Sequence, residues 1–309
     1  MKIKVHSVNS SEKKGTVKKP VGMIKLSNIG VEGDAHSGNW HRQVSLLGTE
    51  SIEKFSQEAG RKIGFGEFAE NITTEGLLLY GTKPLDRFRN EQIELEVTQI
   101  GKKCHGDICT IFREVGNCVM PKEGIFARVI RGGQLKPGDE LECIPRILNI
   151  HIITLSDRAS RGEYSDLSGP QIKTITEKYF AELKRKTQFT HHLIGDNPDE
   201  LRYLTRLAVA EKADVVFTTG GTGIGPRDIT PETIQPMLDK EIPGIMELIR
   251  MKYGQEKPAA LLSRSIAGLI GQTLVYTLPG SVKAVNEYCR EILPTIEHSL
   301  YMINGIDSH

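Results

Sequence analysis

The strongest chemical signal in the sequence is a glycine-rich run, TTGGTGIGPRD, at residues 218–228. Its four glycines allow the backbone to bend sharply and to turn N–H groups toward a ligand without obstruction by Cβ atoms. The hydroxyls of Thr218, Thr219 and Thr222 add further donors, and a helix that starts shortly afterwards favours an anion near its N-terminus. Phosphate is therefore the natural ligand for this run.

The end of the run adds a cation beside a carboxylate, Arg227 and Asp228. This pair suits a site that holds phosphates together with a divalent metal, because arginine pairs with phosphate oxygens and aspartate holds the ion. Without the pair, a plain turn between a strand and a helix would be an equally good interpretation. The run matches neither a Walker loop, since no Gly-Lys-Ser/Thr follows, nor the GxGxxG fingerprint.

The elements around this run can be predicted from local pattern. A short apolar stretch at 215–217 indicates a buried strand before the run. After it, Thr230 is predicted as a helix N-cap, with Pro231 at the first helical position and Glu232 in the first turn.

From residue 147 onward the sequence alternates between apolar strands and amphipathic helices. Strands are predicted at 148–155 and near 189–194. One helix is predicted with Pro170 in its first turn, and another over 198–212. This alternation predicts an α/β domain of three layers, with a mainly parallel sheet covered on both faces. Its ligand site should lie beyond the carboxyl ends of the strands.

The first half of the chain has a different pattern. Short alternating runs at 2–5 and 93–97 and a short apolar-rich run at 125–130 predict strands, separated by turn residues. One helix is expected at 49–59. Many short strands and few helices favour a closed or nearly closed β-barrel. We therefore predict two domains, 1–146 and 147–309.

Bulk composition excludes several classes of function. The chain has 309 residues, 38% hydrophobic and 26% charged, with a net charge of +1. This balance argues against nucleic-acid or membrane binding. Five cysteines are too few for a disulfide scaffold. The N-terminus lacks the apolar core of a signal peptide, and no apolar run approaches a membrane span, so a cytoplasmic protein is expected.

The second half resembles the molybdopterin adenylyltransferases (MogA/MoaB-like proteins). Residues 218–232, TTGGTGIGPRDITPE, are similar to the signature of that family. Further family-like pieces follow the expected order, SDRAS at 156–160, YSDLSGP at 164–170, PG at 243–244, LSR at 262–264 and LPGS at 278–281. The resemblance covers essentially all of 147–309.

This resemblance implies an enzyme that binds molybdopterin and Mg²⁺–ATP and forms adenylated molybdopterin and pyrophosphate, with catalysis by positioning and charge neutralisation. Asp228 matches the family's essential aspartate in the glycine loop, and it is assigned to the Mg²⁺–ATP complex. In the family, a second essential aspartate follows a short apolar strand, in a pattern like Val-Pro-Asp-Glu. Aligning that strand with the strand expected near 189–194 selects Asp196, whereas aligning the Pro-Asp-Glu pattern selects Asp199. Spacing to Thr218 favours Asp196, and Asp199 is also explained as an acidic residue in a first helical turn.

The resemblance also implies nucleotide or molybdopterin contacts from several loops. The residues concerned are Thr219, Gly220, Gly221, Thr222, Gly223, Arg227, Ser263, Arg264, Pro279, Gly280, Ser281, Lys283, Asp157 and Arg158. For Ser281 a simple helix N-cap is an equally good interpretation. Asp157 and Arg158 could instead form a surface ion pair. Relatives of this domain commonly trimerise, so a homotrimer is implied.

The first half resembles the MOSC domain, a β-barrel related to part of the molybdenum-cofactor sulfurases. The matching pieces are GVEGDAH at 30–36, RQVSLL at 42–47, ENITTEG at 70–76, EVTQ at 96–99 and Cys104. Such domains are thought to bind molybdenum cofactor or carry sulfur. Cys104 falls on the characteristic cysteine, although many relatives have proline where this chain has Lys103. Lys102, Lys103 and His105 would favour its thiolate.

Other interpretations of the first half stay open. Cys104, His105, Cys109 and Cys118 could form a zinc site, but they lack a CxxC pair. His36 and His41, near Asp34, could line an anion pocket or be ordinary surface groups. The lysine-rich stretch at 13–19 is predicted to be a solvated loop, with contact to a phosphate as the less favoured alternative. Cys109 and Cys143 are expected to be buried apolar cysteines.

Two functions of different class follow for the whole chain. The favoured one is a nucleotidyltransferase of molybdenum cofactor biosynthesis, Mg²⁺–ATP-dependent, fused to a cofactor-handling barrel. The alternative is a non-catalytic carrier or scaffold that binds molybdopterin or the cofactor. Asp228 favours catalysis, and the altered neighbourhood of Asp196 keeps the carrier open. Molybdenum-insertion or cofactor-dependent enzymes are the expected partners, and the sequence leaves molybdenum and tungsten undistinguished.

Overall fold

The computed structural model describes residues 1–103 and 118–306 of the chain. They form two compact units. Of the described residues, the first comprises those of Met1–Arg146 together with Gly305 and Ile306, and the second comprises Ile147–Asn304. Each unit has its own hydrophobic core. The two are described separately below.

The first unit is built around a closed β-barrel, as the sequence predicts. Its eight-stranded sheet runs in the order β11-β7-β8-β9-β5-β6-β1-β2, and an additional pairing of β11 with β1 closes the ring. All ladders are antiparallel except that between β5 and β6. The strands are β1 (Lys2–Ser10), β2 (Lys19–Val21), β5 (Val44–Gly48), β6 (Ile72–Glu75), β7 (Arg87–Arg89), β8 (Glu94–Ile100), β9 (Ile125–Arg131) and β11 (Glu140–Ile144).

Side-chain alternation along the strands fills the barrel. In β1 the side chains of Ile3 and Val5 are buried, whereas Lys2 and Lys4 are exposed, as the period of two predicts. A second, three-stranded sheet consists of β10 (Gly133–Leu135), β3 (Ile24–Ser27) and β4 (Gly30–Val31), in the strand order β10-β3-β4. The predicted helix is confirmed as α1 (Thr49–Ala59), whose Ile52 and Phe55 enter a second apolar cluster.

The second unit contains the predicted, mainly parallel sheet, in the order β13-β12-β14-β17-β16-β15. The first four strands are parallel, and β16 and β15 add antiparallel strands at one edge. The central strands are almost wholly buried, which explains their continuous apolar sequence. The strands are β12 (Ile147–Leu155), β13 (Lys186–Ile194), β14 (Val215–Thr219), β15 (Lys240–Glu241), β16 (Ala267–Ile270) and β17 (Thr273–Leu278).

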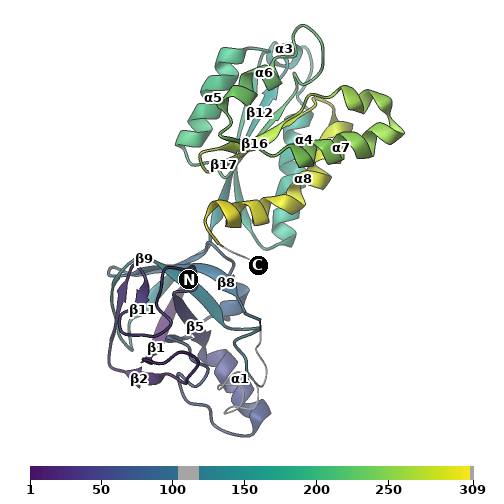
Figure 1. Cartoon of the computed structure of the whole chain (residues 1–309). Coiled ribbons are helices and arrows are strands. Elements are labelled where there is room, and N and C mark those ends of the chain that lie inside the picture. The colour runs from purple at the N-terminus through teal and green to yellow at the C-terminus, as the bar shows by residue number, and fades with distance from the viewer. Residues whose placement is uncertain (104–117, 307–309) are drawn as a thin grey trace. The chain divides into compact units, whose positions relative to one another are not determined.

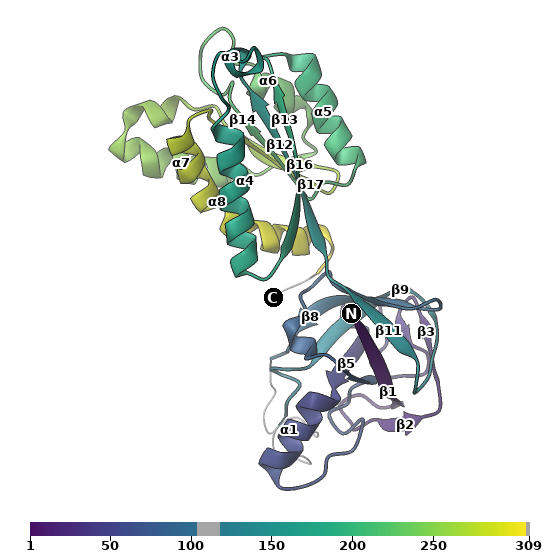
Figure 2. The same cartoon turned by 180° about the vertical axis from the view of Figure 1, so that it is seen from behind.

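Helices cover both faces of this sheet, with α5 on one side and α4 and α8 on the other (Figures 1 and 2). Asn197 caps α5 and Ser281 caps α8 through side-chain oxygens that accept backbone N–H bonds. The helices are α3 (Asp157–Ser160), α4 (Ser168–Glu182), α5 (Pro198–Ala210), α6 (Thr230–Ile234), α7 (Pro243–Glu256) and α8 (Val282–Ile303), with 3₁₀ turns η3 (Gln235–Met237) and η4 (Pro258–Leu262).

One local prediction near the glycine run is wrong. Thr230 does not cap α6 but is its first residue, after Ile229. Its hydroxyl donates to the carbonyl of Gly220 at 2.8 Å, so it fastens the loop rather than the helix N-terminus. Because α6 has only five residues, its dipole contributes little to anion binding.

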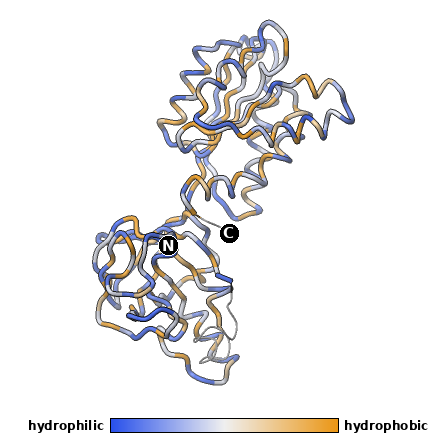
Figure 3. The backbone as a smooth tube through the Cα atoms, viewed as in Figure 1, coloured by the Kyte–Doolittle hydropathy of each residue, from blue (hydrophilic) through white to orange (hydrophobic). Residues whose placement is uncertain are grey.

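Short hydrophobic and hydrophilic stretches alternate along the tube of both units (Figure 3). Within the described ranges, the helices include none that is long and apolar enough to cross a membrane.

Candidate functional site

The candidate site lies at the carboxyl ends of β12, β14 and β17. The backbone N–H of Gly220 donates to the carbonyl of Leu278 at 2.9 Å, and the hydroxyl of Thr219 donates to that of Pro279 at 3.0 Å. A Cβ atom at Gly220, where φ is +105°, would lie 2.2 Å from the carbonyl oxygen of Leu155. The glycine therefore allows the three strand ends to come together.

The larger of two cavities at this edge has a volume of about 410 Å³. Many of the predicted ligand residues line it, and so do several that the sequence did not single out, among them two tyrosines and a second lysine. Its lining is Gly221, Thr222, Gly223, Ile224, Asp228, Ile249, Tyr253, Lys257, Ala259, Ala260, Leu262, Ser263, Pro279, Gly280, Ser281, Lys283, Ala284, Glu287 and Tyr288. We call it the larger cavity.

The second cavity, of about 300 Å³, is called the smaller cavity. Its lining is Leu155, Ser156, Asp157, Arg158, Asp196, Gly221, Gly225, Pro226, Arg227 and Asp228. It is thus rich in carboxylates and guanidinium groups. Gly221 and Asp228 line both cavities, so Asp228 lies where they adjoin.

The glycines of the loop make room for Asp228. The backbone N–H of Gly225 donates to Oδ2 of Asp228 at 2.8 Å. A Cβ atom would lie 2.8 Å from the same oxygen if added to Gly223, and 2.9 Å if added to Gly225. Both approaches are closer than carbon normally allows, so the glycine spacing and the position of this carboxylate depend on each other.

Asp157 joins three loops in the smaller cavity. Its Oδ1 accepts the backbone N–H of Asp196 at 2.9 Å, and its Oδ2 accepts Nη1 of Arg227 at 3.3 Å. The bond from the backbone of Asp196 lowers the pKa of Asp157. Burial, and then the charge of Asp157, raises the pKa of Asp196. Asp196 is therefore the less readily ionised of the two carboxyls.

The carboxylates of the smaller cavity are of the ligand type that Mg²⁺ prefers. In proteins, Mg²⁺ is commonly held by one or two carboxylates together with substrate phosphates. Asp196 and Asp228 fit that pattern on the wall of the smaller cavity. Across the described residues, no three His, Cys, Asp or Glu side chains cluster as a ready-made metal site.

Not every predicted site residue reaches a cavity. Asp199 lies in the first turn of α5 with its side chain 90% exposed, paired with Arg202. Thr219, Gly220 and Arg264 line neither cavity. The guanidinium group of Arg264 instead contacts backbone carbonyls of the glycine loop.

Three further predicted residues have more than one set of contacts. Ser281 both caps α8, accepting the N–H of Ala284 at 3.2 Å, and lines the larger cavity. Lys283 lines that cavity with a mostly exposed side chain. Arg158 lines the smaller cavity and pairs with Glu163, so the ion pair of Arg158 with Asp157 that we considered does not form.

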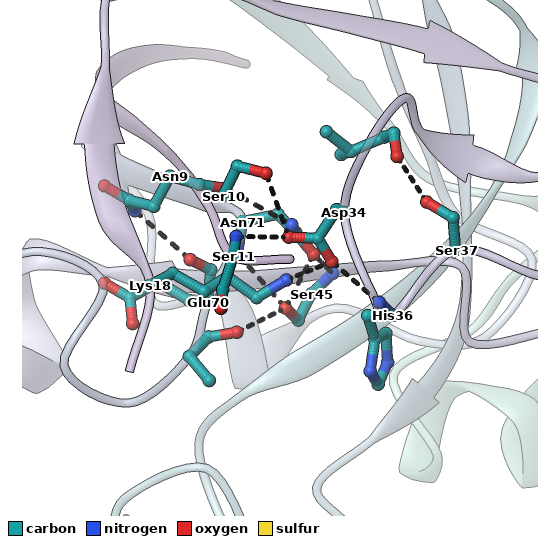
Figure 4. Close-up of polar contacts among 12 residues, drawn as sticks. Asn9, Ser10, Ser11, Lys18, Asp34, His36, Ser37, Ser45, Glu70 and Asn71 are labelled. Atoms are coloured by element: carbon teal, nitrogen blue, oxygen red, sulfur yellow. Dashed lines mark hydrogen bonds and ion pairs between the residues drawn. The ribbon is translucent and has the colours of Figure 1, made fainter. Parts of the chain in front are cut away.

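In the first unit, the lysine-rich stretch is not entirely a solvated loop. Lys18 is buried, and its Nζ lies 2.5 Å from Oδ1 of Asp34. Asp34 also accepts backbone N–H bonds from Ser11 and His36 (Figure 4). The bonds from Lys18 and the backbone outweigh burial and lower the pKa of Asp34. The prediction of a fully solvated stretch is therefore wrong at Lys18.

A small cavity of about 80 Å³ opens beside this ion pair, and we call it the barrel cavity. Lys13, Lys14, Lys18 and Lys102 line it together with Asp34, His36 and Ser45. Burial, and then the charge of Lys18, lowers the pKa of His36 to about 4, so its ring is neutral near pH 7. The lining is rich in lysine, and His36, which the sequence left undecided, belongs to it.

The remaining first-unit predictions concern cysteines. Cys104, His105 and Cys109 lie outside the described residues. Cys118 is half-buried beside an apolar cluster, and Cys143 is buried as expected. The zinc and sulfur interpretations of Cys104 therefore stay predictions.

The ENITTEG motif forms a buried polar network. Oε1 of Glu70 accepts the N–H of Gly66 at 2.5 Å and the hydroxyl of Thr73 at 3.0 Å, while Nδ2 of Asn9 donates to the Glu70 carbonyl at 3.2 Å. Figure 4 shows Asn9, Glu70 and Asn71 grouped near Lys18. Burial raises the pKa of Glu70 to about 7. These hydrogen bonds connect β1, which contains Asn9, to β6, which contains Thr73, and to residues 66–70, which precede β6.

Comparison with known proteins gives the chain's family. Residues 151–298 match the family described as "Probable molybdopterin binding domain", and residues 33–142 match the MOSC domain. Over 159 residues the chain is 36% identical to molybdopterin adenylyltransferase of Helicobacter pylori, which spans 51% of this chain and 89% of that protein. Gephyrin of Dictyostelium discoideum is 38% identical over 162 residues, but these make up only 22% of gephyrin.

Among solved structures, MoaB of Thermus thermophilus is 35% identical and covers 51% of this chain and 97% of its own, with a TM-score of 0.46. The molybdopterin-binding match at 151–298 lies in the second unit, and the MOSC match at 33–142 lies in the first. This chain belongs to the molybdopterin-binding family of molybdenum cofactor biosynthesis proteins through its second unit, which is joined to a MOSC domain.

Proposed function

We propose that the second unit adenylates molybdopterin, using Mg²⁺–ATP and releasing pyrophosphate. The observation that carries this proposal is the position of Asp228, which lines both the larger and the smaller cavity. Two adjoining cavities with one carboxylate between them suit a reaction in which two ligands must meet at a metal-bound phosphate.

The two cavities differ in chemistry, and this difference suggests which ligand each takes. The smaller cavity, with Asp157, Asp196, Arg158 and Arg227 in its wall, suits a polyphosphate and its Mg²⁺. The larger cavity combines apolar walls with hydroxyl groups and the lysines Lys257 and Lys283. Such a mixture suits a flat pterin that carries a phosphate group.

The reaction would be an in-line displacement at the α-phosphorus of ATP. An oxygen of the molybdopterin phosphate forms a new bond to that phosphorus, and the bond to the bridging oxygen of the β-phosphate breaks, so pyrophosphate leaves. Backbone N–H groups of the glycine loop and Arg227 would neutralise charge on the transferred group. Asp228 and Asp196 would hold Mg²⁺, which would supply further neutralisation of the phosphate charge.

For the first unit we propose a cofactor-handling role. The observation that favours it is the concentration of Lys13, Lys14, Lys18 and Lys102 around the barrel cavity, which suits an anionic group such as the phosphate of a pterin cofactor. Cys104 would bind the metal or carry sulfur. We also propose that the chain acts in the cytoplasm as a homotrimer and delivers its product to molybdenum-insertion or cofactor-dependent enzymes.

The proposal is tested by mixing the purified full chain with molybdopterin, ATP and Mg²⁺ and measuring pyrophosphate. Pyrophosphate should appear only when all three are present. Tight binding of molybdopterin without pyrophosphate would instead support a non-catalytic carrier. Absence of both binding and turnover would remove the proposed function.

A further inference from the structure

We propose that Arg264 is a positioning residue that holds the glycine loop in its anion-binding form. Its Nε donates to the carbonyl of Gly223 at 2.6 Å, and its Nη2 donates to the carbonyl of Asp228 at 3.0 Å. Its own backbone N–H donates to the carbonyl of Thr222 at 2.9 Å. One residue therefore binds three carbonyls of a loop that lies 36 to 42 positions earlier in the chain.

These contacts determine which way the loop's N–H groups point. In a planar trans peptide the carbonyl and the N–H of the next residue point in opposite directions. Because the carbonyls of Thr222 and Gly223 point toward Arg264, the N–H groups of Gly223 and Ile224 point away from it. Both of these residues line the larger cavity, which Arg264 does not. Arg264 thus turns acceptors away from the cavity and leaves donors for an anion.

The same side chain fixes the backbone of the catalytic candidate. The carbonyl that Nη2 binds is that of Asp228 itself, and Thr230, two residues later, fastens Gly220 and Gly221. The remaining guanidinium edge pairs with Glu232 on α6. Only arginine can make these contacts together, because its planar guanidinium group carries several N–H donors that point in different directions. The single ammonium group of a lysine cannot bind two carbonyls and a carboxylate at these positions at once.

Replacing Arg264 by lysine tests the clamp. We expect the hydrogen-bonded amides of Gly225, Asp228 and Thr230 to exchange with deuterium roughly 10-fold faster or more, because bonds from a charged donor are lost. Binding of molybdopterin, whose phosphate is proposed to lie in the larger cavity, should weaken by a similar factor. Binding of Mg²⁺–ATP should also weaken, because Asp228, whose carbonyl Arg264 holds, lines the smaller cavity, while binding of adenosine should not change. The matched control is Arg202→Lys on α5, whose side chain is 37% exposed, against 35% for Arg264.

A second variant distinguishes the carbonyl contacts from the ion pair. Glu232→Gln keeps the guanidinium and all three carbonyl bonds, so loop exchange should stay within about 2-fold of wild type. Loop exchange in Arg264→Lys equal to wild type would overturn the proposal. The proposal would also be overturned if the loop amides exchanged as fast in Glu232→Gln as in Arg264→Lys, because the effect would then come from the ion pair with Glu232.

The role of the clamp in nucleotide binding rests on the proposed function, but its effect on the loop does not. If the wild-type chain bound no nucleotide, the proposed function would fail, and the exchange of loop amides would still decide the role of Arg264. If molybdopterin and nucleotide both bound equally well to wild type and Arg264→Lys despite faster loop exchange, the clamp would have no part in anion binding and this inference would fail alone.

Discussion

The carboxylate of Asp157 accepts the backbone N–H of Asp196 at 2.9 Å, which joins the loop after β12 to the loop after β13. The second oxygen of Asp157 accepts Arg227 from the glycine loop at 3.3 Å. Asp196 is thereby held at the wall of the smaller cavity, opposite the loop that carries Asp228. This arrangement separates Asp196 from Asp199, which lies on the exposed start of α5.

Replacing each of these aspartates by asparagine should give very different results. Asp196→Asn removes a carboxylate proposed to hold Mg²⁺, so kcat/KM for adenylation should fall on the order of 100-fold. Asp199→Asn removes an exposed ion pair with Arg202 and should change kcat/KM by less than about 2-fold. Steady-state release of pyrophosphate measures both. The reverse order of effects would make Asp199 the second aspartate of the mechanism.

The buried pair of Lys18 and Asp34 should be strongly coupled. Lys18→Met leaves a buried carboxylate without its partner and should lower the free energy of unfolding by roughly 3–5 kcal/mol. Because Asp34→Asn in the same chain removes that stranded charge, the double variant should lose clearly less than the sum of the single changes. Urea unfolding followed by fluorescence reports on this unit, since Trp40 is the only tryptophan in the sequence.

The control for that cycle is Lys2→Met, which breaks the exposed pair with Glu140. It should leave the unfolding midpoint unchanged within error. Purely additive effects of Lys18→Met and Asp34→Asn would contradict the coupling.

Glu70 should make the first unit less stable as pH rises toward neutrality. Burial raises its pKa from 4.5 to about 7, so the folded chain holds a proton that the unfolded chain has already released. The free energy of unfolding should therefore fall between about pH 4.5 and pH 7, by roughly 3 kcal/mol from this group, and then level off. Urea unfolding at several pH values, followed through Trp40, measures the slope.

Glu70→Gln should remove this part of the slope, because glutamine has no proton to release. Glu53→Gln, on the exposed face of α1, should keep the wild-type slope. Identical slopes for Glu70→Gln and wild type would show that Glu70 is ionised in the folded chain across this range.

Cys104→Ser should separate the two proposed activities. Loss of the thiol should reduce retention of molybdenum cofactor or sulfur, while pyrophosphate release by the second unit stays at the wild-type rate. Retention is measured as the amount of cofactor that stays with the protein after desalting, with Cys118→Ser as the matched control. Equal retention by wild type and Cys104→Ser would exclude the proposed role of the thiol.

Much of the fold follows from local pattern, because strand alternation and helix caps act over a few residues. The barrel, the parallel sheet and α1 were predicted in this way. The glycine loop is also a local signal, since its glycines are required by the short approach to Asp228. Thr230 was misassigned because a threonine before proline has the local features of a cap, whereas its actual partner is Gly220, ten residues earlier.

Long-range contacts were beyond local pattern. Lys18 lies in a stretch as polar as any surface loop, and its ion pair with Asp34, 16 residues later, is not visible in the local pattern. Arg264 was predicted to contact a ligand. Its guanidinium group instead binds carbonyls of the glycine loop, which lies about 40 residues earlier in the sequence, and local pattern does not show this contact. A turn whose carbonyls face a distant arginine leaves no signal in the sequence itself.

Single-turnover formation of pyrophosphate by Asp228→Asn, compared with wild type, tests the central claim most directly. Both proteins are mixed in excess with molybdopterin, Mg²⁺ and labelled ATP, and folding is verified by thermal unfolding. We expect rapid pyrophosphate release by wild type and a rate at least on the order of 100-fold lower in the variant, because the carboxylate between the two cavities is lost. Equal rates in the two proteins would contradict it.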